Sequence, residues 1–320
     1  MDAQRRLKLA LIGLGRLGAI RARILAFQQP RIELVAACDN KPGANEWAVA
    51  NLPSSVKFYA DPEDCMRNSG AEAILISTAT ATHAPLICLD DDSYRAAKLM
   101  VENGTLGNIH AVETTCLDQQ DPTGFFVTFS AQSGGIFVDM GIDIGRYFLD
   151  VKSGLKNPKK QVNRVIAMGQ QAVYGDLAKY GDCDNGWGLV EFANGKVLTT
   201  HLGRTLTNGF EGMTRVCGTK GHSVINGNST INRVEIRDSY GVRTATTPDA
   251  FVLYDKSFLN DLAEFADCVL ENKPLTCTPE DAYEAAKIAN ALQYSFRKGV
   301  PVFFDDDGLP IMEVDSTETP

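Results

Sequence analysis

The sequence predicts an α/β fold in which an N-terminal Rossmann unit, built on a doubly wound parallel sheet, precedes an α+β domain with a large, mainly antiparallel open sheet. Short apolar runs alternate with helical patterns over the first third of the chain, which is typical of parallel strands joined by helices. Strand and turn signals then dominate from about 111 to 244. Two helical patterns close the chain.

Each element of the first third has a local signal. Apolar strands are expected at 8–12, 32–38, 56–59 and 73–77, and helices at 19–27, 45–51, from 61 onward and at 93–103. Asp61 and Pro62 have the N-cap and first-turn proline that favour a helix start. Strands separated by helices of this length predict parallel pairing.

The second part has the spacing of hairpins. Strands are expected at 189–192, 197–202, 214–216, 221–225 and 234–237, as one antiparallel sheet. Asn194-Gly195 supplies the turn of the first hairpin. Of the closing helices, one has Phe258 and Leu262 at helical spacing, and the other starts at Thr278-Pro279 with an N-cap threonine.

Composition narrows the function classes. The chain has 320 residues, 44% apolar and 22% charged, with a net charge of -9, so a nucleic-acid or anionic membrane surface is not expected. No apolar run approaches the length of about 20 residues that spans a bilayer. Eight cysteines without a C-x-x-C pair and four scattered histidines predict no metal site and a reducing, cytoplasmic location.

The strand at 8–12 runs into a glycine-rich turn. The pattern G-x-G-x-x-G is formed by Gly13, Leu14, Gly15, Arg16, Leu17 and Gly18. In a dinucleotide site the first glycine permits the tight turn, the second lets the phosphates approach the backbone, and the third lets helix and strand pack closely. A glycine turn in an unrelated α/β fold is the alternative.

Asp39 follows Gly18 at about the spacing of the acid that binds the ribose 2′-hydroxyl. A carboxylate repels a 2′-phosphate, which favours NAD, although Asn40 or Lys41 leaves NADP possible. Ser77 ends the strand at 73–77 and Thr78 and His83 follow it, at the edge where open α/β sheets bind ligands. We expect these three in the cofactor site; a polar loop that only caps the strand is the alternative.

The chain resembles the Gfo/Idh/MocA family of NAD(P)-dependent oxidoreductases. The segments that carry the resemblance are 10–18, 37–39, 76–78 with 82–84, 93–95 with 104–107, 133–141 and 218–221. The resemblance implies hydride transfer between a nicotinamide and a polyol, sugar or related secondary alcohol. It also implies a Rossmann domain at 1–89 and a C-terminal α/β domain at 90–305 whose sheet packs against another subunit in a homo-oligomer. The residues at 306–320 form an acidic tail.

Two departures from the family pattern affect the chemistry. Family members continue from the T-x-x-H-A helix into a fifth strand that ends in Glu-Lys-Pro, whereas here 84–89 runs directly into 90–94. A segment comparable to one βαβ unit is therefore missing, together with the family's lysine, so the Rossmann sheet is expected to be truncated. The family also places a histidine four residues after Asp139, where this chain has Asp143.

Only Asp139 remains from the family's acid/base pair, so it is the candidate catalytic residue, with Asp143 and Tyr94 as weaker substitutes. An alcohol dehydrogenase needs a base for the hydroxyl proton. A capping or ion-pair carboxylate is the alternative role for Asp139. Three functions stay open: an oxidoreductase, a nucleotide-binding pseudoenzyme or regulator, and a truncated or mis-spliced inactive form.

Overall fold

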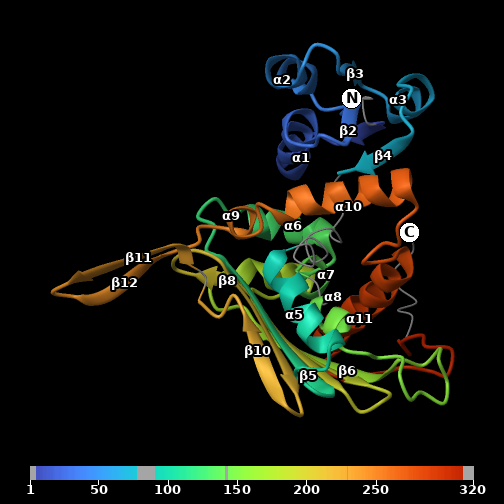
Figure 1. Cartoon of the computed structure of the whole chain (residues 1–320). Helices are drawn as coiled ribbons and strands as arrows, with labels where there is room; N and C mark the ends of the chain where they lie inside the picture. Colours follow the sequence, from blue (N-terminus) through green and yellow to red (C-terminus); the bar gives the residue numbers. More distant parts are fainter. Residues whose placement is uncertain (1–4, 78–90, 141–142, 229, 313–320) are drawn as a thin grey trace. The chain divides into compact units, whose positions relative to one another are not determined.

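A computed structural model describes residues 5–77, 91–140, 143–228 and 230–312 (Figure 1). The chain divides into two compact units, Met1–Thr80 with Asp255–Thr276, and Ala81–Tyr254 with Cys277–Pro320. The first unit is discontinuous in sequence because a late helix packs with the N-terminal elements. This differs from the continuous division after residue 89 that the sequence suggested.

The first unit is a Rossmann sheet with its helices. Its elements are β1 (Leu7–Ile12), α1 (Arg16–Phe27), β2 (Ile32–Cys38), α2 (Ala44–Asn51), β3 (Lys57–Tyr59), α3 (Pro62–Asn68), β4 (Ala73–Ile76) and α10 (Ser257–Glu271). Across the described residues the strand order is β3-β2-β1-β4, and every pair is parallel. The predicted parallel sheet is confirmed.

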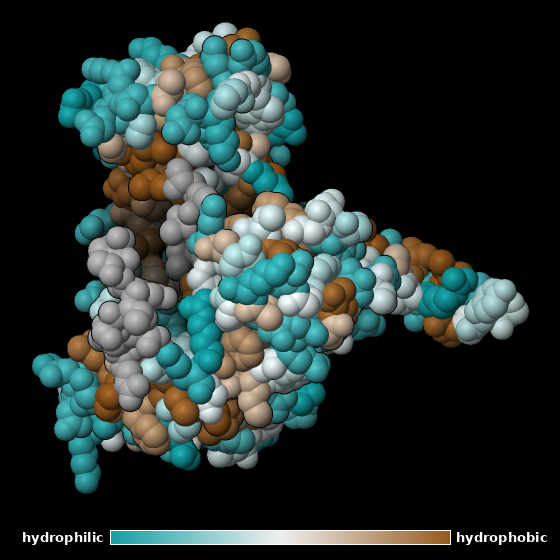
Figure 2. All heavy atoms as spheres, turned by 180° about the vertical axis from the view of Figure 1, so that it is seen from behind, coloured by the Kyte–Doolittle hydropathy of each residue, from teal (hydrophilic) through white to brown (hydrophobic). Residues whose placement is uncertain are grey.

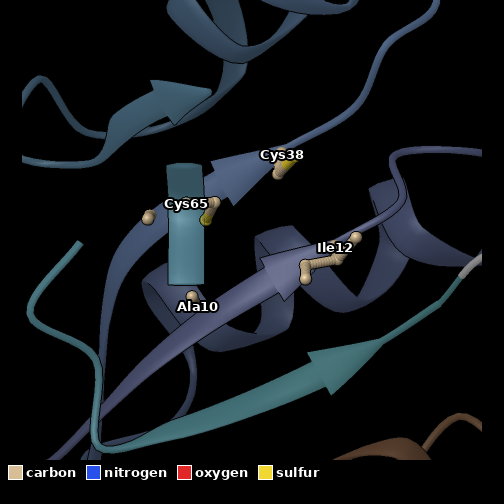
Figure 3. Packing of buried hydrophobic residues seen from close by; sticks show 5 residues of the cluster. Ala10, Ile12, Cys38 and Cys65 are labelled. Atoms are coloured by element: carbon tan, nitrogen blue, oxygen red, sulfur yellow. The ribbon is translucent and has the colours of Figure 1, made fainter. Parts of the chain in front are cut away.

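Strand alternation distributes the apolar residues of β1 to both faces of this sheet. Ala10 and Ile12 lie in a buried cluster with Cys38 of β2 and Cys65 of α3 (Figure 3). The helix α10 is tied to this unit by an ion pair between Arg21 and Asp261, with 2.6 Å between Nη2 and Oδ2. The late helix therefore completes the N-terminal unit.

The second unit is built on a seven-stranded sheet. Its strands are β5 (Ile109–Gln119), β6 (Val162–Gln170), β7 (Asn185–Phe192), β8 (Val197–Leu206), β9 (Glu211–Gly218), β10 (Gly221–Ile225) and β13 (Val302–Phe303). Among the described residues the order of this sheet is β10-β9-β5-β8-β7-β6-β13, and within it only β5 and β8 pair in parallel. The large, mainly antiparallel sheet is confirmed.

Two details of the strand prediction were wrong. The strands β11 (Thr230–Asp238) and β12 (Gly241–Thr246) form a separate two-stranded sheet and do not continue the large one. The region expected to be mostly strands also contains the helices α6 (Phe125–Ser133), α7 (Ile136–Asp139) and α8 (Asp143–Phe148), and the 3-10 helix η2 (Gly175–Tyr180).

Helices cover one face of the large sheet. Besides α6 to α8 they are α5 (Asp92–Glu102), α9 (Ala250–Leu253) and α11 (Pro279–Lys298). Gly188 of β7 lies under Leu292 of α11, and Gly186 under Phe137 of α7. No helix among the described residues is long and apolar enough to cross a membrane.

Candidate cofactor site and active site

The cofactor candidates lie at the carboxyl ends of β1, β2 and β4. Since β2 flanks β1 on one side and β4 flanks it on the other, the chain reverses direction across the sheet at β1. Open α/β sheets bind ligands at such a switch point. Gly13 directly follows β1, and Ser77 directly follows β4.

The three glycines have the backbone properties that their predicted roles require. Gly13 has a φ of +100°, a region that L side chains rarely adopt. A Cβ on Gly18 would lie 2.0 Å from the carbonyl oxygen of Gly13, so helix and turn pack too closely for any side chain. A Cβ on Gly15 would meet nothing within 4 Å. The backbone at Gly15 therefore leaves space for a ligand to approach.

The helix α1 starts directly at this turn. It begins at Arg16, its N-cap is Gly15, and no side chain of the described residues caps it. Its first turn carries no acidic residue. The N–H groups and the positive dipole end of a helix start favour an anion such as a pyrophosphate.

Asp39 connects the end of β2 to the glycine turn. Its Oδ2 accepts a hydrogen bond from the backbone N–H of Leu14 at 2.6 Å, and its Oδ1 accepts one from the N–H of Lys41 at 2.8 Å. Each carboxylate oxygen has a second lone pair for another donor. The predicted acid therefore lies against the glycine turn and is suited to accept the hydroxyls of a diol.

Ser77 belongs to the same cluster. Its N–H donates to the carbonyl of Ile12 at 2.7 Å, and its Oγ lies 3.5 Å from the position of a Cβ on Gly18. Gly13, Gly18, Asp39 and Ser77 are thus brought together around one switch point. Thr78 and His83 lie outside the described residues.

Asp139, the catalytic candidate, is the last residue of α7 in the second unit. Its Oδ2 accepts a hydrogen bond from Nη2 of Arg204, on β8. Arg204 is fully buried, and its guanidinium carbon lies 4.8 Å from the centre of the Phe126 ring. Within the described part of the chain, Nε and Nη1 of Arg204 have no hydrogen-bond partner.

Buried polar groups hold the start of α7 in place. Asp182 accepts hydrogen bonds from the N–H of Ile136 at 2.8 Å and from Oγ of Ser130 at 2.7 Å. Oε1 of Gln293 accepts one from the N–H of Phe137 at 3.2 Å. These acceptors satisfy N–H groups that a helix start leaves open, so Asp182 and Gln293 of α11 fix the start of the helix that carries Asp139.

Sequence reasoning missed Arg204. The available signal was an arginine between Gly203 and Thr205 inside a strand with an apolar, alternating pattern. An arginine that becomes buried needs an acidic partner, and Asp139 lies 65 positions earlier in the chain.

Comparison with known proteins identifies the family. Residues 7–88 match the Gfo/Idh/MocA oxidoreductase family model for the NAD-binding Rossmann fold, and residues 98–304 match the model for the C-terminal alpha/beta domain. The chain is 26% identical to scyllo-inositol 2-dehydrogenase (NAD(+)) of Bacillus subtilis (strain 168), over 94% of this chain and 97% of that protein. Identity to myo-inositol 2-dehydrogenase of Thermotoga maritima is 25%, over 92% and 96%.

A solved structure agrees with these matches. The crystal structure of myo-inositol 2-dehydrogenase from Lactobacillus plantarum superposes with a TM-score of 0.84 at 26% identity, and covers 94% of this chain and 100% of that one. The Bacillus alignment spans 347 positions. Because 94% of 320 residues is about 301, roughly 46 positions of that alignment lie opposite gaps in this chain. The chain belongs to the Gfo/Idh/MocA oxidoreductase family, with an NAD-binding Rossmann domain followed by the family's C-terminal α/β domain.

Proposed function

We propose that this protein is an NAD-dependent oxidoreductase that transfers a hydride between the nicotinamide and a secondary alcohol of a polyol such as inositol. The observation that carries the proposal is the cluster of Gly13, Gly18, Asp39 and Ser77 at the switch point of the parallel sheet. The inositol dehydrogenases among the relatives support the substrate class.

In this proposal the glycine turn and the start of α1 bind the pyrophosphate, and Asp39 binds the adenosine ribose. The bound dinucleotide supplies the hydride acceptor. The preference is for NAD, because a 2′-phosphate would bring negative charge against the Asp39 carboxylate, which already lies against the turn through Leu14. Leu14, Arg16 and Leu17 complete the turn, and Thr78 and His83 remain predicted members of the site.

Asp139 is the proposed catalytic residue. A carboxylate can accept the hydrogen bond of a substrate hydroxyl, and then its proton, while the hydride leaves carbon. Arg204 would act as a positioning residue, because it contacts Asp139 and is itself fully buried.

The experiment is a two-step assay. Fluorescence and melting temperature are followed while the protein is titrated with NADH and NADPH, since a ligand that binds the native state raises its apparent stability. NADH formation is then measured with NAD and scyllo-inositol or myo-inositol. Saturable NADH binding and polyol-dependent reduction of NAD to NADH support the proposal. A folded protein that binds neither NADH nor NADPH contradicts it.

A nucleotide-binding protein without turnover is the second candidate. The gaps in the alignment and the absence of Glu-Lys-Pro after 84–89 favour it, because the family's lysine is lost with that segment. NADH binding without any polyol-dependent reduction would select this candidate. A truncated or mis-spliced form predicts poor folding, because the loss of strands exposes sheet edges.

We also propose that the protein is a homo-oligomer assembled through the large sheet. On the face away from α11, exposed apolar side chains lie in register on β6 and β7: Ile166 opposite Leu189, and Met168 opposite Trp187. An apolar patch of this kind on a sheet face is typical of an interaction surface. Measurement of the molar mass by light scattering tests the homo-oligomer.

We also propose a cytoplasmic location. It is supported by the free cysteines among the described residues, because a reducing compartment keeps thiols free.

A further inference from the structure

Asp118 lies near the end of β5, level with Arg204 on the neighbouring strand β8. The parallel register on either side of it is Leu117 opposite Gly203 and Gln119 opposite Leu206. The register therefore shifts by one residue at Asp118, which is typical of a β-bulge. Bulges are over-represented next to active sites, where they redirect a side chain.

Asp118 is expected on the face of the sheet that the helices cover. Successive residues of a strand point to opposite faces, so Asp118 shares its face with Cys116, which lies opposite Leu202 of β8. Arg204 follows Leu202 by two positions, and it contacts Asp139 of α7 and the Phe126 ring of α6 on that face.

The thiol of Cys116 reports which charges lie around it. Burial raises the pKa of this thiol, and the charges of Asp118 and Asp139 raise it further, whereas the charge of Arg204 lowers it. A charge shifts a pKa mainly from a short distance. Asp118 therefore belongs to the same cluster of side chains as Asp139 and Arg204.

The cluster offers the groups that a polyol needs. Asp118 and Asp139 are partly exposed, so a ligand can reach their oxygens. Arg204 is fully buried, and its Nε and Nη1 have no partner within the described residues. Unsatisfied buried donors call for an acceptor that a ligand or water supplies. Since a hydroxyl group both donates and accepts hydrogen bonds, a polyol fits this cluster.

Charge narrows the ligand further. The cluster has two acidic side chains and one basic one, so a carboxylate on the ligand would be repelled. The surface of β11 and β12 shows a contrast, because exposed apolar side chains such as Val234 and Val242 lie along it (Figure 2). Apolar surface offers hydroxyl groups no hydrogen-bond partner. A neutral polyol therefore finds its donors and acceptors at the cluster.

We propose that Asp118 is a second substrate-binding carboxylate, which accepts a hydrogen bond from one hydroxyl of the polyol while Asp139 accepts one from another hydroxyl. The inference rests on the proposed function for its substrate class. It makes Asp118 a specificity-determining residue, because each carboxylate then needs a hydroxyl of its own and a carboxylated sugar is disfavoured.

The test is isothermal titration calorimetry of the full chain, with and without saturating NADH. The neutral probe is scyllo-inositol, and the anionic probe is glucuronate. Asp118→Asn keeps the size of the side chain and removes its charge. We expect its Kd for scyllo-inositol to rise at least about tenfold, because hydrogen bonds to charged acceptors are the stronger ones. The loss for glucuronate should be smaller, since a repulsion is removed as well, whereas a merely structural defect would weaken both probes equally.

Glu113→Gln is the matched control. Glu113 lies on the same strand as Asp118, at an odd separation and therefore on the opposite face. Its side chain is 44% exposed and pairs with Arg215 at 2.8 Å. The control removes the same charge from the chain, so it should bind scyllo-inositol like the unmodified protein.

Three results would overturn the inference: no binding of scyllo-inositol in either titration, an Asp118→Asn variant with unchanged affinity, or equal losses for the two probes. Circular dichroism and NADH fluorescence control folding, since the cofactor candidates lie in the other unit. A variant that misfolds is replaced by Asp118→Ser, judged by the same results. NADH binding without polyol binding rejects the role of Asp118 and leaves cofactor binding standing, whereas polyol binding without NADH binding contradicts the proposed oxidoreductase alone.

Discussion

The carboxylate of Asp139 accepts a hydrogen bond from the guanidinium of Arg204, and the two partners differ in their access to water. The side chain of Arg204 is 0% exposed, whereas that of Asp139 is 20% exposed. Removal of Asp139 and removal of Arg204 should therefore have different effects on stability. Water can reach the carboxylate of Asp139 after Arg204 is removed, whereas it cannot reach the guanidinium of Arg204 after Asp139 is removed.

Asp139→Asn should destabilise the protein more than Arg204→Met does. The first change leaves a buried guanidinium without its carboxylate and should lower the free energy of unfolding by about 3 kcal/mol. The second leaves a carboxylate that water reaches and an apolar side chain in the buried position, so we expect roughly half that loss. Urea unfolding at neutral pH measures both, and a larger loss for Arg204→Met would contradict the asymmetry.

Gly15 and Gly18 should respond differently to alanine. Gly18→Ala forces a Cβ to within 2.0 Å of a backbone oxygen, so the turn must shift and both the melting temperature and NADH affinity should fall. Gly15→Ala meets no protein atom within 4 Å and has ordinary helical N-cap geometry, so the melting temperature should hold while NADH affinity falls. Loss of stability in Gly15→Ala, or unchanged NADH affinity there, would argue against a phosphate at this turn.

Asp39→Ser should reduce NADH affinity and relax the discrimination against NADPH. The change removes the charged acceptor of the Leu14 N–H and the proposed acceptor of the ribose hydroxyls. Hydrogen bonds to charged groups contribute about 1.5–3 kcal/mol, so we expect the Kd for NADH to rise at least about tenfold. Parallel fluorescence titrations give the ratio of the two Kd values. An unchanged ratio would mean that Asp39 only supports the turn.

Local signals allowed helix starts in both units to be predicted. The cap at Asp61 accepts from the N–H of Asp64 at 2.8 Å, and Thr278 and Asp281 form a reciprocal capping box, both of which follow from a few adjacent residues. The glycine turn and Asp39 follow from spacing within one βαβ unit.

Features set by distant contacts were not predicted. The helix Phe125–Ser133 has aromatic and β-branched residues that favour strands, and its packing in the second unit overrides that preference. The pairing of Arg204 with Asp139 joins β8 to α7 and leaves no local pattern. The departure of β11 from the large sheet likewise depends on tertiary structure, since its sequence alternates like that of any half-exposed strand.

His201 should make the stability of the second unit depend on pH below neutrality. Its ring stacks on Trp187 with centroids 4.5 Å apart, and its Nε2 is buried without a partner within the described residues. Burial lowers the pKa of His201 from 6.5, and Glu211 opposes this only partly. The folded protein therefore takes up this proton at a lower pH than the unfolded chain does.

The pKa of His201 is 6.5 in the unfolded chain and lower in the folded protein. At a pH between these two values the unfolded state binds more protons, so the free energy of unfolding falls as the pH is lowered through 6.5. Above 6.5 the ring is neutral in both states and contributes no slope. His201→Gln removes the titrating group, and we expect urea unfolding of this variant to lose less stability between pH 7 and pH 5 than the unmodified chain loses. Equal losses in the two proteins would assign the acid sensitivity to other groups.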